Sequence, residues 1–246
     1  MSETDARAAR AAFERLLDAA PELAQRLSPA YTGQAERFVA LLLEANARLN
    51  LTRVVEPEAV ARLHLLDSIA ALPILDDLRP ERALDLGSGG GVPGIPLAMA
   101  RPEVRWTLVD SVGKKVEALR TMIASLGLDH VTAVAERAEI LGRDPLHREA
   151  HDVVTARACA ALPVLVEYAL PLLGPGGTLL AWKGPISDEE LGAGAAAAAL
   201  IGGGPPVVEP GPASLGDHRF VLVRKIGPTP ARYPRRPGAP SRSPLA

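Results

Sequence analysis

Cysteine and aromatic residues are almost absent from this chain of 246 residues. Cys159 is the only cysteine, which excludes a disulfide framework and a zinc site built from cysteines. Aromatic residues make up 3% of the sequence, so alanine, leucine and valine must build the core. No apolar run free of charge, proline and glycine is long enough to span a bilayer, and the charged N-terminus, MSETDARAARAAF, has no signal-peptide core. We therefore expect a cytoplasmic protein without a membrane segment.

Acidic residues are missing from the end of the chain. The segment from His218 to Ala246 holds seven basic residues and no acidic one, so a net charge of −2 for the whole chain leaves −9 for residues 1–217. A basic end on an acidic body suggests a polyanionic partner, although a solvated, disordered end is the alternative. Six prolines between residues 228 and 244 exclude a regular helix or a central strand there. Removal of this tail is expected to weaken RNA binding and to leave cofactor binding unchanged.

The most informative stretch is RALDLGSGGGVPGIPLAMA, residues 82–100. A short apolar run interrupted by Asp85 predicts a buried parallel strand, and an apolar helical pattern begins after the glycines. A strand, a glycine turn and a helix in this order bring backbone N–H groups and a positive helix end close to a nucleotide-like ligand. Glycine suits such a turn because it adopts positive φ and lets the backbone approach the ligand. The glycines are Gly87, Gly89, Gly90, Gly91 and Gly94.

Two cofactor classes are compatible with this turn. Residues 89–94 satisfy G-x-G-x-x-G, and Asp110 lies about 20 residues further on, as in dinucleotide-binding proteins. A carboxylate at the mouth of the turn, Asp85, would repel a pyrophosphate but suits a cationic ligand. The spacing D-x-G-S-G-G-G resembles the first motif of class I S-adenosylmethionine-dependent methyltransferases, in which Asp110 would accept both ribose hydroxyls. A dinucleotide oxidoreductase stays the alternative, opposed by Asp85 and by the absence of a hydride-transfer constellation.

The chain after the turn alternates between strand and helix patterns. Such repeated βα units are typical of a doubly wound, mainly parallel sheet. The last two strand patterns predict an antiparallel edge pair, and residues 192–206, rich in alanine and glycine, predict a weak helix with a flexible connection. Strands are expected at 82–86, 105–109, 130–135, 152–156, 178–183, 207–208 and 220–225, and helices at 28–49, 57–75, 114–126 and 162–173.

Several segments together resemble the bacterial small-subunit ribosomal RNA (guanine-N7) methyltransferases of the RsmG or GidB family. They span about residues 45 to 245. The resemblance implies an α/β class I methyltransferase fold with a Rossmann-like, doubly wound, mainly parallel seven-stranded sheet. It also implies methyl transfer from S-adenosylmethionine to N7 of a guanine, guanine 527 in standard rRNA numbering, in 16S ribosomal RNA. The matching segments are Asn50-Leu51-Thr52, His64 to Ser68, Asp85 to Pro96, Asp110-Ser111-x-x-Lys114-Lys115, Arg157-Ala158, Leu173 to Gly177, Trp182 to Gly184 and Pro230 to Pro240.

The resemblance also implies roles for particular residues. The cofactor is expected to meet the turn at Gly87 and Val92, the ribose site at Asp110, and the adenine site at Ala138 and Glu139. Arg157 is expected to close the site, and the motif itself adds Asp85 and Gly89 to the cofactor contacts. His64 and Asp67 are expected on the substrate side, where they and Arg157 would orient the guanine. Candidate contacts to RNA phosphates are Lys114, Lys115, Lys183, Arg232, Arg235 and Arg236.

The expected organisation has three parts: an N-terminal helical segment (1–78) packed on the rest, an S-adenosylmethionine-binding catalytic domain (79–226), and a basic, proline-rich tail (227–246). The expected partner is 16S ribosomal RNA or the small ribosomal subunit, with no metal, and the protein is expected to act as a monomer. Two further alternatives are a non-catalytic RNA-binding factor and a small-molecule methyltransferase. The intact motif residues oppose the first, and the basic tail opposes the second.

Overall fold

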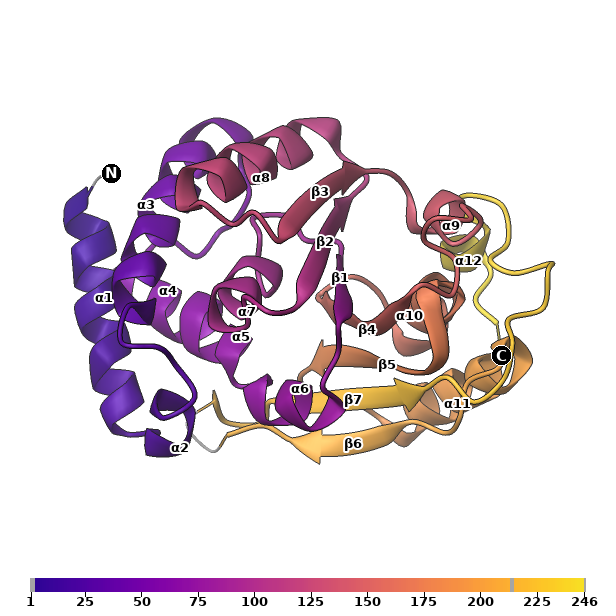
Figure 1. Ribbon diagram of the computed structural model, residues 1–246. Helices are drawn as coiled ribbons and strands as arrows, with labels where there is room; N and C mark the ends of the chain where they lie inside the picture. The colour runs from indigo at the N-terminus through magenta and orange to yellow at the C-terminus, as the bar shows by residue number, and fades with distance from the viewer. Residues whose placement is uncertain (1–2, 213–214, 246) are drawn as a thin grey trace.

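The computed structural model describes residues 3–212 and 215–245, so the outermost residues of the predicted N-terminal segment and tail lie outside the described part. Its centre is a seven-stranded sheet with the order β3-β2-β1-β4-β5-β7-β6. Strands β1 to β5 are parallel, and β7 runs antiparallel to both β5 and β6 (Figure 1). The doubly wound sheet and its antiparallel edge pair are therefore confirmed. The strands are β1 (Arg82–Leu86), β2 (Arg105–Asp110), β3 (Val131–Ala135), β4 (His151–Arg157), β5 (Leu173–Lys183), β6 (Val207–Pro210) and β7 (Arg219–Arg224).

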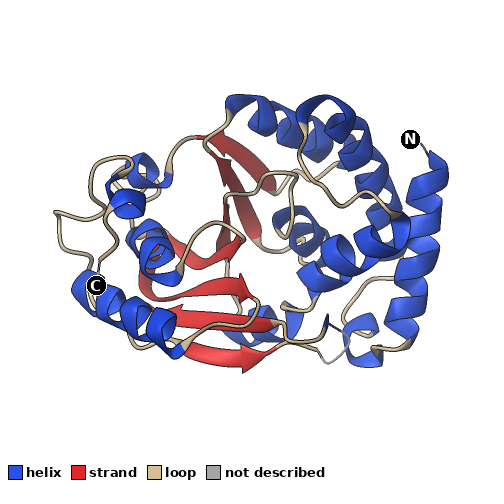
Figure 2. Ribbon diagram, turned by 180° about the vertical axis from the view of Figure 1, so that it is seen from behind, coloured by secondary structure: helices blue, strands red, loops and turns tan. Residues whose placement is uncertain are grey.

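Alternation along the strands divides the core into two layers. Because successive side chains of a strand point to opposite faces, Ala83 joins one buried cluster and Leu84 the other. Helices cover both faces of the sheet (Figure 2). One layer contains the N-terminal helices, α7 (Gly94–Ala100) and α8 (Gly113–Leu126), and the other contains α9 (Ala138–Leu141), α10 (Leu162–Ala169) and α11 (Asp188–Ile201).

The N-terminal helices pack on the first layer. The phenol of Tyr31 donates a 3.1 Å hydrogen bond to the carbonyl of Pro96, which fixes the third helix against α7. Contrary to the expected start at residue 28, that helix begins at Tyr31, after a turn in which the Tyr31 N–H binds the Ser28 carbonyl. The helices are α1 (Glu3–Asp18), α2 (Pro21–Ala24), α3 (Tyr31–Leu49), α4 (Pro57–Val60), the π-helix η1 (Ala61–Leu66), α5 (Asp67–Ile69) and α6 (Leu72–Leu78).

The prediction of a single helix over residues 57–75 is wrong, because several shorter helices occupy this range. A π-helical turn, η1, interrupts it, and a new helix begins around Pro73, which has no N–H for continuing the ladder. Single π-helical turns occur frequently at functional sites. The turn here carries His64 and is followed directly by Asp67, the two residues assigned to the substrate side.

The alanine- and glycine-rich segment is better ordered than expected. Ser187 caps α11 by accepting a hydrogen bond from the N–H of Glu190. A Cβ on Gly194 would lie 2.4 Å from Leu162, so glycine is what permits the close approach of α11 to α10. The connection to β6 is held to the neighbouring strand, because the N–H of Gly204 binds the Arg224 carbonyl at 2.8 Å.

The C-terminal tail also departs from the alternative of a solvated, disordered end. It folds back onto α9 and α10 and forms one helical turn, α12 (Ala239–Arg242), before the end of the described chain. Its root is a buried lysine, Lys225, whose ammonium group donates to the Leu170 carbonyl at 2.7 Å and pairs with Glu149 at 3.3 Å. Across the described residues, no helix combines the length and apolarity needed to cross a membrane.

A pair of histidines beneath the sheet makes stability depend on pH. His151 is 1% exposed and stacks on His147, with their facing ring nitrogens 3.4 Å apart. Burial, and then the neighbouring imidazole, lower the pKa of His151 from 6.5 to about 4. The unfolded chain therefore binds a proton more readily than the folded one, and stability is lost as the pH falls from 6.5 to about 4.

We expect His151→Gln to flatten this acid-side loss. The wild-type protein should lose roughly 3 kcal/mol of unfolding free energy from this residue across that window, since one pKa unit corresponds to about 1.4 kcal/mol and the pKa falls from 6.5 to about 4. Denaturant unfolding of both proteins at several pH values measures the difference. Equal pH slopes for the two proteins would contradict the assignment.

Candidate active site

The glycine turn that follows β1 has a backbone conformation that residues with a side chain rarely adopt. Gly87, Gly89 and Gly91 all have positive φ, at 74°, 51° and 90°. The N–H groups of Gly87 and Ser88 both bind the Val109 carbonyl, at 2.8 and 2.9 Å, so the turn is anchored to the end of β2. The sequence motif thus builds a rigid turn at the carboxyl end of the sheet, where open α/β folds bind their ligands.

The helix after the turn starts in close contact with the strands. A Cβ on Gly94 would lie 2.4 Å from Leu108 and 2.8 Å from a carboxylate oxygen of Asp85. Any larger residue would push α7 away from β1 and β2. Glycine at this position therefore sets the distance between helix and sheet, rather than the contact with a ligand.

Asp110 ends β2 with its carboxylate held by two backbone donors. Oδ2 accepts the N–H of Gly89 at 3.1 Å, and Oδ1 accepts the N–H of Val112 at 2.8 Å. These bonds tie the carboxylate to the glycine turn and fix its orientation. Because each carboxylate oxygen has a second lone pair, Asp110 can still accept hydrogen bonds from a ligand.

A cavity of about 230 Å³ opens beside this carboxylate. Four of the residues assigned to the cofactor meet there: Gly87, Asp110, Ala138 and Glu139. The cavity is lined by both apolar and polar side chains, which suits a nucleoside whose base is flat and whose ribose carries hydroxyls. The remaining residues that line it are Leu86, Val109, Ser111, Glu136, Arg137, Cys159 and Tyr168.

Glu139 carries its negative charge in a nearly buried position. Its side chain is 2% exposed and accepts hydrogen bonds from Arg137 at 3.0 Å and from the N–H of Gly238 at 2.7 Å. Burial alone would raise the pKa of Glu139, but these two donors outweigh it and hold the pKa below its usual value. The group is therefore a carboxylate at neutral pH.

Cys159 lines the same cavity. Its thiol donates to the Leu86 carbonyl at 2.8 Å. Desolvation, together with the carboxylates of Asp85 and Asp110, raises its pKa, which disfavours the reactive thiolate. Neither Cys159 nor Tyr168 was assigned from the sequence, because a lone cysteine and a tyrosine within an apolar helix match no motif.

Asp85 does not stand at the mouth of the turn as expected. Its side chain is fully buried, and Oδ1 accepts a 2.8 Å hydrogen bond from the hydroxyl of Thr155 on β4. The strand places it on the face covered by α7, beneath the turn, and burial raises its pKa. Its carboxyl group thus lies behind the backbone of the turn, so the position that the sequence argument gave to Asp85 is wrong.

Three other residues assigned to the cofactor also lie elsewhere. Gly89 holds Asp110 from outside the cavity lining, and Val92 packs against the hydrophobic core. Arg157 lines a second, larger cleft of about 650 Å³. The two hollows meet at the end of β4, since Ala158 lines the cleft and Cys159 lines the cavity.

The second cleft centres on Asp67, which joins three segments of the chain. One oxygen pairs with Arg157 at 2.7 Å and the other with His218 at 2.7 Å, while its backbone carbonyl accepts the indole N–H of Trp182 at 2.9 Å. Arg157 also donates to the Leu63 carbonyl at 2.6 Å. The structure thus brings Asp67 and Arg157 together, and it adds His218 and Trp182, which sequence spacing could not have linked.

His64 lines this cleft in its neutral form. Its Nε2 lies 2.9 Å from the hydroxyl of Thr52, and its buried Nδ1 has no partner among the described residues. Burial, followed by the charge of Arg157, lowers the pKa of His64 to about 4. At neutral pH this imidazole can donate or accept a hydrogen bond, but it carries no charge.

The candidate RNA contacts divide into exposed and engaged side chains. Lys114 is exposed in the first turn of α8, three residues after the cavity-lining Ser111. Lys183 instead donates to Glu190 and to the Ala160 carbonyl, at 2.8 and 3.0 Å. Arg235 pairs with the buried carboxylate of Glu167, so its charge is neutralised within the fold. Lys115 is partly exposed, and Arg232 and Arg236 are exposed.

Metal binding has no structural support within residues 3–212 and 215–245. No group of three or more histidine, cysteine, aspartate or glutamate side chains there could hold an ion.

The fold and the cavity define the class of protein. In dinucleotide-binding proteins the common strand order is 3-2-1-4-5-6, whereas here the antiparallel β7 lies between β5 and β6. Together with a glycine turn after β1 and an acidic residue ending β2, this arrangement is that of class I methyltransferases. A Bacillus cereus O-methyltransferase solved in complex with SAH has the same fold, with a TM-score of 0.51, 19% sequence identity, and coverage of 76% of this chain and 90% of that one. The CurJ carbon methyltransferase gives a TM-score of 0.54 at 15% identity, covering 87% and 70%.

Sequence comparison identifies the family within this class. The family model for GidB, rRNA small subunit methyltransferase G, matches residues 32–206. The ribosomal RNA small subunit methyltransferase G of Deinococcus radiodurans is 45% identical over 236 residues, which cover 94% of this chain and 92% of the relative. Its Deinococcus deserti counterpart is 46% identical, covering 95% and 96%. The chain belongs to the rRNA small subunit methyltransferase G family.

The position of Asp110 predicts a measurable effect on cofactor binding. Replacing it with alanine removes the acceptor at the cavity and the bonds that hold Gly89 and Val112, so affinity for S-adenosylmethionine should fall by about 1–3 kcal/mol. Isothermal calorimetry on the folded variant measures the loss. Asp129→Ala, at an exposed site outside this cavity, is the matched control and should bind as the wild type does. Equal affinity in both variants would contradict the role of Asp110.

Proposed function

We propose that this protein methylates N7 of a guanine in 16S ribosomal RNA, guanine 527 in the standard numbering, with S-adenosylmethionine as the donor. The observation that carries the proposal is the junction at the end of β4, where residues 157–159 separate a nucleoside-sized cavity from a larger open cleft. A donor in the cavity and a base in the cleft would face one another across this junction. Membership of the rRNA small subunit methyltransferase G family supports the choice of RNA.

The cofactor contributes a methyl group made electrophilic by a sulfonium centre. Around it, Asp110 would receive the ribose hydroxyls, and the wall at Ala138 and Glu139 would flank the adenine. Gly87 keeps side-chain bulk out of the cavity, since a Cβ there would also strike the Cys159 sulfur at 2.3 Å. Arg157 lies on the cleft side of the junction, so we place it with the guanine rather than with the cofactor.

The chemistry of the nucleophile means that the cleft does not have to supply a base. Guanine N7 carries an in-plane lone pair and no proton, so the protein needs only to align it with the methyl group. His64 is neutral and Asp67 is committed to Arg157 and His218, an arrangement suited to orienting a base rather than to removing a proton. N7 lies on the deep, narrow major-groove edge of A-form RNA, so the target must be unstacked or lie in a loop.

RNA phosphates would be met by the exposed cations around this face. Lys114, Lys115, Arg232 and Arg236 keep the role assigned to them, and the contacts of Lys183 and Arg235 give these two a structural role instead. We further propose that the protein acts as a cytoplasmic monomer without metal. We also propose that the chain consists of an N-terminal helical segment (1–78), a catalytic domain (79–226) and a tail (227–246).

Two substrate analogues and a pH series test the attack at N7. A target RNA with 7-deazaguanine at the modified position should bind but show no methyl transfer, because this base lacks N7. Inosine at that position keeps N7 and lacks only the exocyclic amine, so it should still react. The single-turnover rate should be nearly flat across neutral pH, because the pKa of His64 is about 4 and no proton leaves N7. A rate rising tenfold per pH unit, or methylation of the 7-deaza substrate, would require attack at another atom.

Salt dependence tests the phosphate contacts. Removal of Lys114 and Lys115 together should reduce the slope of log K against log salt by up to about 2 units, if each lysine meets one phosphate. The matched control is Arg105→Ala with Arg82→Ala, two exposed cations at the opposite, amino end of the sheet. Filter binding of target RNA at several salt concentrations measures the slopes. A slope unchanged from wild type would place the RNA on another surface.

A further inference from the structure

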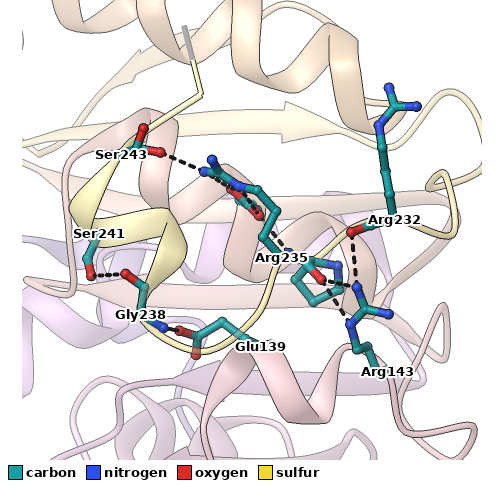
Figure 3. A network of polar contacts seen from close by, with 9 residues as sticks. Glu139, Arg143, Arg232, Arg235, Gly238, Ser241 and Ser243 are labelled. Atoms are coloured by element: carbon teal, nitrogen blue, oxygen red, sulfur yellow. Dashed lines mark hydrogen bonds and ion pairs between the residues drawn. The ribbon is translucent and has the colours of Figure 1, made fainter.

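The C-terminal tail returns to the cofactor cavity instead of leaving the body of the protein. We call residues 230–243 the strap. Arg143, just after α9, donates to the strap carbonyls of Pro234, at 2.6 and 2.9 Å, and Arg232, at 3.0 Å (Figure 3). Arg148 adds a 2.9 Å hydrogen bond to the Tyr233 carbonyl. Two arginines of the body therefore fix the backbone of the strap.

The strap in turn satisfies a carboxylate that is fully buried. Arg235 donates from Nε to both oxygens of Glu167, at 2.9 and 3.0 Å, from Nη2 to Oε2 at 2.6 Å, and from its backbone N–H to Oε1 at 2.8 Å. Glu167 lies on α10 and is 0% exposed. A buried charge is tolerated only with such partners, so α10 and the strap are held together as one unit.

Two residues that line the cavity touch the strap directly. The N–H of Gly238 donates to Glu139 at 2.7 Å, and Ser241, whose hydroxyl donates to the Gly238 carbonyl at 3.2 Å, lies beside the phenol of Tyr168. Glu139 lies on α9, and Tyr168 follows Glu167 on α10. The positions of both lining residues therefore depend on a segment about 70 to 100 residues further along the chain.

We propose that the strap is a positioning element of the cofactor site, and that it sets the cavity wall by holding Glu139 and Tyr168. The inference rests on the proposed function only in taking the cofactor as the ligand of this cavity. It reverses the sequence-based expectation that loss of the tail leaves cofactor binding unchanged. Because such coupling is reciprocal, a ligand in the cavity also stabilises the strap in its contact with Glu139.

The test compares the full chain with a chain ending at Arg236. This truncation keeps the Arg235–Glu167 pair and removes Gly238 and Ser241, the residues that touch the cavity wall. S-adenosylhomocysteine is the probe, and calorimetry measures its affinity. We expect about tenfold weaker binding, a KM for S-adenosylmethionine raised by a similar factor, and a kcat at saturating cofactor within about twofold of the full chain.

A second variant covers the case in which the truncated chain does not fold. Ser241→Ala in the full chain removes the hydroxyl that bonds the Gly238 carbonyl and lies beside Tyr168, and should weaken binding of the same probe by about two- to fivefold. The matched control is Ser125→Ala, an exposed residue of α8 outside the strap and the cavity, which should bind as the full chain does. In a Glu139→Ala background, the truncation should cost less than its effect in the wild type, since the two changes remove one shared contact.

Reciprocity gives an independent readout. Hydrogen exchange at the Gly238 amide should slow when S-adenosylhomocysteine binds to the full chain, while exchange on the distant α1 should not change. A folded truncated chain that binds the probe as tightly as the full chain, or Ser241→Ala with full affinity, would overturn the role of the strap. If the full chain itself does not bind the probe, the proposed function fails, and that result is distinct from equal binding by both chains.

Discussion

The bare backbone between β1 and α7 is the constraint on which the rest of the site depends. Three glycines turn the chain through positive φ, and Gly94 lets α7 begin within contact distance of the sheet. This geometry brings the Gly89 N–H to the carboxylate of Asp110, so the turn and the end of β2 form one rigid edge of the cavity. Side chains in the turn would disturb the strands, the helix and the ligand-binding edge together. This requirement explains why glycines are concentrated in residues 87–94.

The end of β4 contributes residues to both the cofactor cavity and the larger cleft. Arg157 points into the cleft and pairs with Asp67, while Cys159, two residues later, lines the cavity. The N-terminal helices supply Leu63, His64 and Asp67 to the cleft, and the C-terminal strap supplies contacts to the cavity wall. The Rossmann-like sheet therefore positions the cofactor, and the segments outside it complete both binding sites.

Local patterns in the sequence were enough to predict the sheet but not the contacts that complete the site. Apolar runs alternating with helical patterns predicted all seven strands, although β5 begins at Leu173, five residues before its predicted start. Strand and helix periodicities are properties of short windows. The burial of Asp85 was missed because a strand motif does not say which face is covered. The pairs Asp67–Arg157 and Glu139–Gly238, 90 and 99 residues apart, depend on tertiary packing, and so does the engagement of Arg235 by Glu167. The number of basic residues in the tail could not reveal that one of them, Arg235, pairs with the buried carboxylate of Glu167.

The central claim is that cavity and cleft together deliver a methyl group to N7 of one guanine in 16S ribosomal RNA. The most direct measurement is a map of N7-methylguanine in 16S rRNA from cells with and without this protein. The account predicts that a single N7-methylguanine, at position 527, is lost without the protein and returns when the wild-type chain is supplied. An unchanged map, or the loss of a modification at a different atom or in a different RNA, would contradict it.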